Sequence, residues 1–235
     1  MESAEGQHER QYQFLLAGLE RRILHRLARA LPDRVMPDHL SILGLLAATG
    51  VGLSYVLTNR DPAWLWGATG FLILQWYGDS LDGTLARVRR IERPRYGYYL
   101  DHLLDAYSTF IIGLGLGLSP YMLLSVGLGI VIAYLIMSIN VYLETHVYSE
   151  FSLGYGRVGP TEIRVLIILV NTSALVIGPL PFRLLGVPGT IFDVVGIAVF
   201  AGMLALLLGR VIGNLRRLAA LEPPRRGRPP GGDGP

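Results

Sequence analysis

The chain has 235 residues, of which 51% are hydrophobic and only 17% are charged, and its mean hydropathy is +0.42. This composition is typical of an integral membrane protein. The chain contains no cysteine and no lysine, which excludes disulfides, thiol nucleophiles, Schiff-base catalysis and cysteine-ligated metals. A net charge of +3 is too small to indicate nucleic-acid binding.

Residues 1–35 are predicted to form a cytoplasmic segment that contains an amphipathic helix. Apolar side chains recur at helical spacing from Tyr12 to Leu27, and four arginines occupy other faces. We expect this helix to lie on the membrane surface. The chain does not begin with a charged segment followed by a cleavage site, so the N-terminal segment is expected to be retained.

Six apolar stretches follow, each near the roughly 20 residues needed to cross a bilayer. They lie at residues 40–57, 64–86, 98–118, 121–143, 162–180 and 190–213. They predict an all-α integral membrane domain of six transmembrane helices over residues 36–215. The final segment, 216–235, is rich in proline, glycine and arginine and is predicted to be a disordered cytoplasmic tail.

Arginines are distributed unequally between the connecting segments. Six spans place both termini on one side, and the segments on that side carry most of the arginines, whereas the opposite loops contain only Arg60 and Arg183. The protein is expected to reside in the inner or plasma membrane. By the positive-inside rule, both termini are expected on the cytoplasmic side.

Four aspartates are expected at similar depth near the cytoplasmic face. Asp79 and Asp82 fall in the last turns of the second span, and Asp101 and Asp105 fall one to two turns inside the third. Spacings of three and four residues place each pair on one helical face, so two antiparallel neighbouring helices could form one acidic cage. Because a carboxylate in a membrane helix costs about 2.5 to 3.5 kcal/mol, a cation is expected among them.

Oxygen ligands without cysteine favour Mg2+ or Mn2+ over zinc or copper, and four carboxylates could hold one ion or two. A simpler alternative is that the aspartates only pair with the arginines at 87–95.

Small residues beside the acidic cluster either leave room for phosphates or allow close helix packing. They are Gly78, Gly83, Ala86 and Gly97. The Arg87 guanidinium could bind a phosphate or nucleotide, or it could equally extend to the membrane interface as a snorkelling anchor.

These residues form a longer pattern. Asp79-Ser-Leu-Asp82-Gly83-Thr-Leu-Ala86-Arg87, then nine residues, then Gly97, Asp101 and Asp105 resembles the signature DxxDGxxAR(x8-9)GxxxDxxxD of the CDP-alcohol phosphotransferase, or phosphatidyltransferase, family. The resemblance covers 27 residues with eight specified positions. The six-span layout with an amphipathic N-terminal helix is also similar to the bacterial members.

The resemblance implies a reaction in which an alcohol attacks the β-phosphorus of a CDP-linked donor such as CDP-diacylglycerol, CMP leaves, and a phospholipid or its precursor forms. It implies that the first three aspartates bind metal on the pyrophosphate, and that Asp105 takes the acceptor's proton and also touches metal. Residues implied to contact or make room for the nucleotide are Gly83, Ala86, Arg87 and Gly97. Similar proteins are homodimers.

A weaker resemblance lies before the first span. Met36-Pro37-Asp38-His39-Leu40-Ser41 is similar to the family's Pro-Asn-x-Leu-Thr motif, with Asp38 in place of asparagine at a position of nucleotide or backbone contact. Asp38 can still cap the following helix. His102 after Asp101 is similar to the Asp-His pair of aminoalcohol phosphotransferases, where it would assist the base, although an interfacial bystander fits equally well.

The acceptor side is less clear. Arg157, Arg164 and Arg210 flank the last two spans, and similar enzymes use arginines of this region to bind an acceptor phosphate. Each is explained equally well as an ordinary positive-inside flank.

One alternative function is a CDP-choline or CDP-ethanolamine phosphotransferase with a lipid acceptor. Another is a cation transporter, although its ionisable groups would be expected near the membrane midplane.

Overall fold

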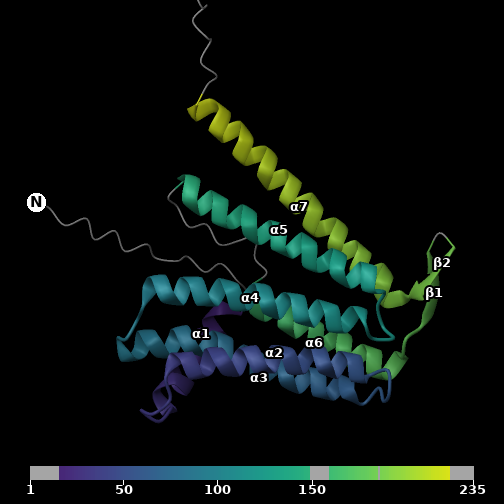
Figure 1. Cartoon of the computed structure of the whole chain (residues 1–235), viewed down its shortest axis with the longest axis horizontal. Helices are drawn as coiled ribbons and strands as arrows, with labels where there is room; N and C mark the ends of the chain where they lie inside the picture. Colours follow the sequence, from purple (N-terminus) through teal and green to yellow (C-terminus); the bar gives the residue numbers. More distant parts are fainter. Residues whose placement is uncertain (1–15, 149–158, 185, 223–235) are drawn as a thin grey trace, which may run out of the picture.

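The computed structural model describes residues 16–148, 159–184 and 186–222, and most of these residues are helical (Figure 1). The elements in these ranges are α1 (Ala17–Ala30), α2 (Pro37–Leu57), α3 (Trp64–Arg89), α4 (Pro94–Gly117), α5 (Leu124–Tyr148), α6 (Pro160–Ile177), β1 (Pro181–Leu184), β2 (Val187–Thr190) and α7 (Ile191–Leu221). Helices α2 to α7 correspond in order to the six predicted apolar stretches, which confirms the all-α prediction. Helix α7 runs on to Leu221, so the start of the predicted tail is helical.

Four of the described helices are long and apolar enough to cross a bilayer, namely α2, α5, α6 and α7. Helices α3 and α4 match them in length, with 26 and 24 residues, but carry the four aspartates together with polar residues such as Gln75. The presence of these polar groups lowers the mean hydropathy of both helices. Six spans therefore remain a prediction for this chain, and four are supported by length and composition.

Helix α2 lies between the two helices that carry the aspartates. It packs along both α3 and α4, and α3 and α4 are not among the closely packed pairs of described helices. Glycines permit the close approach: a Cβ on Gly78 of α3 would lie 2.6 Å from the backbone of Gly44 on α2, and Gly115 of α4 contacts the backbone of Gly52 on α2. Helices α3 and α4 are therefore joined mainly through α2, while three of their aspartates still line one pocket.

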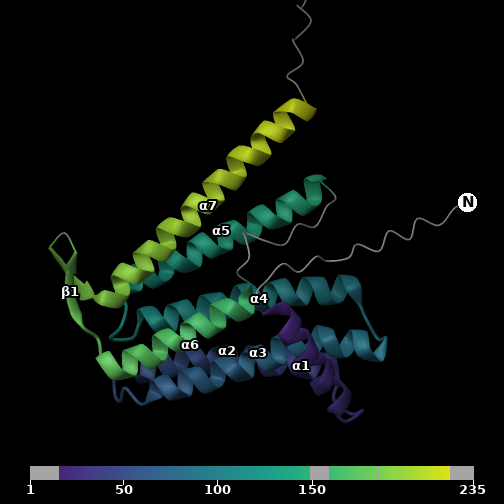
Figure 2. The same cartoon turned by 180° about the vertical axis from the view of Figure 1, so that it is seen from behind.

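The bundle divides into two groups of helices. Helices α2, α3, α4 and α6 run side by side, whereas α5 and α7 form a pair that diverges from them (Figures 1 and 2). Helix α5 contacts both α4 and α7. A core of buried side chains from α2 and α3, with Ala174 of α6, holds the first group together.

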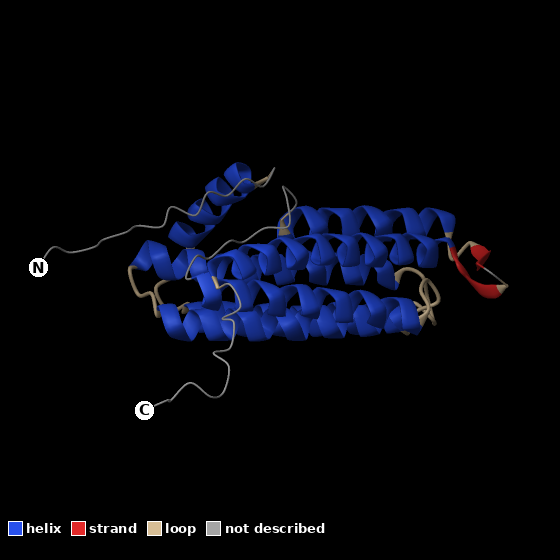
Figure 3. Cartoon of the chain, turned by 90° about the horizontal axis from the view of Figure 1, so that it is seen from above, coloured by secondary structure: helices blue, strands red, loops and turns tan. Residues whose placement is uncertain are grey.

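Strands β1 and β2 form a two-stranded antiparallel hairpin between α6 and α7, at one end of the bundle (Figure 3). These strands were not predicted from the sequence, because four-residue strands carry too little periodicity to be recognised. At the base of the hairpin, Thr190 caps α7, and buried Asp193 accepts hydrogen bonds from the backbone N–H groups of Leu123 and Thr190, each at 2.6 Å. These bonds fix the start of α7 against the start of α5.

Helix α1 occupies the predicted amphipathic segment and packs against α3 (Figure 2). Its buried Leu24 and Ala28 contact Leu81 and Leu85 of α3. Leu19 and Ile23 remain exposed on another face, beside the arginines at 22, 26 and 29. Its place on a membrane surface stays a prediction.

Candidate active site

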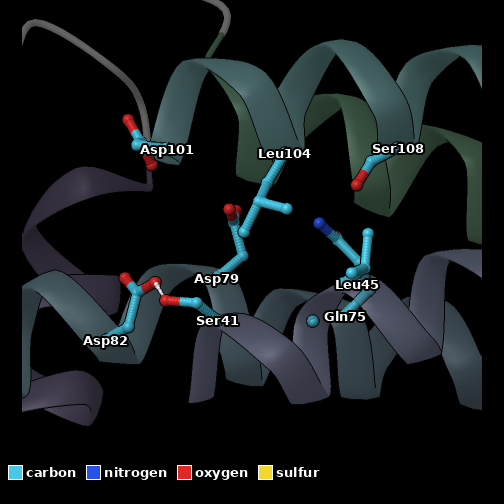
Figure 4. A pocket seen from close by; sticks show the side chains of 9 residues that line it. Ser41, Leu45, Gln75, Asp79, Asp82, Asp101, Leu104 and Ser108 are labelled. Carbon is cyan, nitrogen blue, oxygen red and sulfur yellow. Dashed lines mark hydrogen bonds between the residues drawn. The ribbon is translucent and has the colours of Figure 1, made fainter. Parts of the chain in front are cut away.

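Three of the four aspartates line one small pocket formed by α2, α3 and α4. Figure 4 shows Asp79 and Asp82 of α3 facing Asp101 of α4 across this pocket. The remaining lining residues come from the same three helices and are Ser41, Gly44, Leu45, Gln75, Leu104 and Ser108. Three of the signature aspartates therefore lie in one place. Helix α2, which packs on both α3 and α4, also contributes to the wall between them.

Asp82 is held by a residue of α2. The Ser41 hydroxyl donates a 2.5 Å hydrogen bond to Asp82 Oδ2, and Ser41 itself is buried. The backbone N–H of Gly83 also contacts Asp82 Oδ1. Hydrogen bonds to a carboxylate stabilise its charged form and fix its rotamer.

Asp79 is paired with an arginine of α6. Arg164 Nη2 donates to Asp79 Oδ2 at 2.5 Å, and Arg164 Nε donates to Gln75 Oε1 at 2.9 Å. Gln75 and Asp79 are four residues apart on α3, so both face α6. The structure therefore places Arg164 inside the carboxylate cluster, where its positive charge offsets part of the acidic repulsion.

The two aspartates of α4 differ in exposure. The Asp101 side chain is 54% exposed at the mouth of the pocket, whereas Asp105, one turn further along, is half-buried. Asp105 is not among the lining residues, yet the charges of Asp79, Asp101, Asp82 and Arg164 all act on it. It lies one helical turn from Asp101 on the same face of α4.

The donor chemistry of the cluster suits a hard divalent cation. Its potential ligands are carboxylate oxygens with nearby hydroxyl and amide oxygens, which Mg2+ and Mn2+ prefer. Among the described residues, however, no three acidic or histidine side chains are close enough together to hold a metal ion. The residues fit such an ion in kind, and side-chain rotation and release of Asp79 from Arg164 would be needed for several of them to share it.

The small residues of the signature have different roles in the structure. A Cβ on Gly97 would meet no atom within 4 Å, and one on Gly83 would meet only the Arg87 guanidinium at 3.5 Å, so both positions border open space. Gly78 instead contacts α2, which is the helix-packing alternative. Arg87 is exposed and donates to Thr84 Oγ1 at 3.2 Å, and Ala86 is partly buried beside it.

Asp38 does not cap α2. Its carboxylate pairs with the exposed Arg93, just before α4, and a separate shallow pocket lies beside this pair. The backbone N–H of Met36 is instead bonded by His39 Nδ1 at 3.2 Å. Asp38 pairs with an arginine because the α3–α4 turn brings Arg93 next to the start of α2.

His102 packs among aromatic side chains and lies within ion-pair distance of Asp101. Its Nδ1 lies 2.6 Å from the Tyr98 carbonyl oxygen, and its ring packs against Tyr98 and Tyr142 at centroid distances of 4.1 and 4.8 Å. The nearest Asp101 oxygen is 3.8 Å from Nδ1. His102 thus belongs to an aromatic cluster between α4 and α5.

Arg210 lies on the diverging helix pair. It forms a buried ion pair with Glu144 of α5, donating through Nε at 2.7 and 2.8 Å to the two carboxylate oxygens. Asn140 and Asn214 also donate to Glu144 Oε1. Arg157 falls outside the described residues, so of the three acceptor arginines only Arg164 is placed beside the aspartates.

Sequence reasoning missed the two side chains that form hydrogen bonds with the charged groups of this site, Ser41 and Gln75. Ser41 occupies the last position of the Pro-Asn-x-Leu-Thr resemblance, so a signal for its hydroxyl was present. Gln75 lies one turn before Asp79 and carries no motif of its own. Its contact with Arg164 joins residues 89 apart, which no local pattern indicates.

The helical bundle is apolar, but one end of it carries a pocket lined by three carboxylates, and Arg164 is bonded to one of them. This arrangement is typical of a membrane protein with a polar functional site. Residues 34–211 match the family model described as CDP-alcohol phosphatidyltransferase, and the chain belongs to this family. It is therefore an integral membrane transferase of substituted phosphate groups, in a family that generally depends on divalent metal. This membership removes the support for a cation transporter.

Proposed function

We propose that the protein transfers a phosphatidyl or other substituted phosphoryl group from a CDP-linked donor, CDP-diacylglycerol, to a polar alcohol and releases CMP. The observation that carries this proposal is the gathering of Asp79, Asp82 and Asp101 on one pocket, with Asp105 one turn beyond Asp101 on α4. The reaction is a step in the synthesis of a phospholipid or its precursor.

The bond changes follow from the donor's pyrophosphate. The acceptor hydroxyl oxygen attacks the β-phosphorus, and the bond from this phosphorus to the bridging oxygen breaks, so its electron pair leaves with CMP. Asp105 takes the hydroxyl proton, since it lies one turn from Asp101 on the same face of α4 and an ionised carboxylate can act as a general base. The new phosphodiester stays on the alcohol.

The carboxylates of the pocket are the proposed ligands of Mg2+ or Mn2+, as one ion or two, with Asp79, Asp82 and Asp101 as main ligands and Asp105 as a further contact. A bound divalent ion would neutralise the pyrophosphate and stabilise the departing CMP. Ser41 would hold the Asp82 carboxylate in one orientation for this purpose.

The two substrates are proposed to occupy different sides of the carboxylates. The open space beside Gly83 and Gly97 suits the cytidine nucleotide, with Ala86, Arg87 and Asp38 at its margin. Arg164 suits an anionic group on the acceptor, since guanidinium groups bind phosphates through paired N–H donors. Arg157 and Arg210 are proposed as further acceptor contacts, although Arg210 would first have to share its guanidinium with Glu144.

The proposed setting is an inner or plasma membrane crossed by all six helices α2 to α7, with both termini and the pocket on the cytoplasmic side. The amphipathic α1 would lie in the interface, with its exposed Leu19 and Ile23 in the lipid. A homodimer is proposed from the family resemblance alone. The glycines of α4 and α5 do not support it, because Gly113, Gly117 and Gly127 contact each other's helices within one chain.

The decisive test is CMP release by the purified protein with Mg2+ and CDP-diacylglycerol, using glycerol phosphate, inositol phosphate, inositol and serine as acceptors. One acceptor should support release, and removal of metal with EDTA should abolish it reversibly. Asp105→Asn should lower the rate by about 100- to 10,000-fold. Asp61→Asn is the matched control, because Asp61 lies in the α2–α3 loop and its carboxylate accepts a local hydrogen bond from the Ala63 N–H.

Two negative outcomes would redirect the assignment. If the protein binds CDP but no acceptor supports CMP release, CDP-choline and CDP-ethanolamine with diacylglycerol become the donor and acceptor to test, and His102→Gln the variant. If neither CDP nor Mg2+ binds, the proposed reaction is wrong.

A further inference from the structure

The Arg164 guanidinium bridges two α3 side chains of different charge. Its Nη2 contacts the Asp79 carboxylate at 2.5 Å, and its Nε contacts the Gln75 amide oxygen at 2.9 Å. The Arg164 and Asp79 side chains are only 14% and 20% exposed, and Gln75 is buried. Water therefore screens this pair weakly, and its electrostatic energy exceeds that of a surface ion pair.

Asp79 has two possible cationic partners. It is a proposed metal ligand, yet its Oδ2 already accepts a hydrogen bond from Arg164. A divalent cation at that oxygen has to displace the guanidinium or accept its repulsion at close range. Arg164 and the cation therefore compete for the same carboxylate.

The second contact of Arg164 does not take part in that competition. Gln75 is neutral, so it attracts a divalent cation less than the four carboxylates do, and its bond to Nε can persist when Nη2 leaves Asp79. Gln75 thus keeps the released guanidinium beside the pocket instead of letting it swing away on its flexible stem. The released N–H donors would then face an anionic acceptor.

We propose that Arg164 is the internal counter-ion of Asp79, and that Gln75 is a positioning residue which keeps it in place, so that a divalent cation and an anionic acceptor bind cooperatively. The cation takes Asp79 and the acceptor anion takes Arg164. This inference rests on the proposed function for the identity of the two ligands. Because binding couplings are reciprocal, each ligand raises the affinity for the other by the same factor.

The test measures Mn2+ binding by electron paramagnetic resonance on the full-length protein in lipid nanodiscs, without CDP donor. Arg164→Gln removes the competing charge and should tighten Mn2+ binding by about fivefold or more, the lower range of measured couplings. Arg164→Lys keeps the charge and should stay closer to the wild type. Arg183→Gln removes one positive charge from the hairpin at the other end of the bundle and should leave the Mn2+ affinity unchanged.

A second measurement uses the wild-type protein and does not depend on the folding of a variant. Glycerol phosphate, as an anionic probe, should tighten Mn2+ binding after correction for the Mn2+ that it complexes in solution. This effect should shrink in Arg164→Gln. Gln75→Leu should raise the KM of the anionic acceptor while the KM of the CDP donor stays unchanged, which a general loss of packing would not do.

The outcomes separate this inference from the proposed function. Unchanged or weaker Mn2+ binding in Arg164→Gln, or no effect of glycerol phosphate on the wild type, would overturn the competition while leaving the transferase assignment intact. Absence of Mn2+ binding to the wild type would overturn the competition, and CMP release with Mg2+ and CDP-diacylglycerol would then decide the transferase assignment separately.

Discussion

Ser41 on α2 donates a 2.5 Å hydrogen bond to Asp82 on α3, so one signature carboxylate is oriented by a helix outside the signature. The neighbouring carboxylate, Asp79, is bonded from α6. The 27-residue signature therefore supplies the acidic groups of the site, and two other helices set their positions.

Replacing Ser41 tests this dependence. Ser41→Ala removes a hydrogen bond to a charged group, a loss of about 1.5 to 3 kcal/mol, which corresponds to roughly a 10- to 100-fold fall in kcat/KM. Ser41→Thr keeps the hydroxyl and should retain most of the activity. CMP release at varied CDP-diacylglycerol measures both variants, and equal rates for Ser41→Ala and the wild type would show that Asp82 needs no support from α2.

The sequence predicted which aspartates gather at this site better than it predicted the arrangement of the helices. The three- and four-residue spacings of the aspartates place each pair on one helical face, because local helix geometry determines that relationship. Which helix lies beside which depends instead on the fit of glycines such as Gly44 on Gly78, and no periodic pattern records that fit. The intervening α2 and the reach of Arg164 to Asp79 were therefore not predictable.

The contact between α2 and α4 is predicted to be sensitive to a single methyl group. A Cβ on Gly115 would clash with the backbone of Gly52, which cannot move aside as a side-chain tip can. Gly115→Ala should therefore lower the free energy of unfolding by about 1 to 3 kcal/mol. Gly70→Ala is the matched control, since a Cβ there meets nothing within 4 Å and alanine favours the helix.

Unfolding of both glycine variants can be followed by circular dichroism in mixed micelles. We expect the midpoint of Gly115→Ala to fall and that of Gly70→Ala to stay level or rise. Equal midpoints would mean that α2 and α4 are less closely packed than their glycines indicate.

The buried pair of Glu144 and Arg210 is predicted to hold α7 to α5. Among the described elements α7 packs mainly on α5, and this pair is an ion pair between them. Arg210→Met leaves a buried carboxylate without its partner and should cost about 3 to 5 kcal/mol of stability. The double variant Glu144→Gln with Arg210→Met removes the stranded charge while its amide can still bond Asn140 and Asn214, so it should recover most of the loss. If the single and double variants were equally stable, the loss of stability in Arg210→Met would not come from the unpaired Glu144 charge.

The six-span arrangement makes a prediction that four spans do not. The chain has no cysteine, so Glu92→Cys in the α3–α4 turn and Arg183→Cys in the hairpin each carry one exposed thiol. If α2 to α7 all cross the membrane, residues 92 and 183 lie on opposite sides, with 92 in the arginine-rich cytoplasmic turn. A membrane-impermeant maleimide should then label 183 on intact cells and label 92 only after lysis. If only the four apolar helices α2, α5, α6 and α7 crossed, residue 92 would stay on the same side as 183, and both would be labelled without lysis.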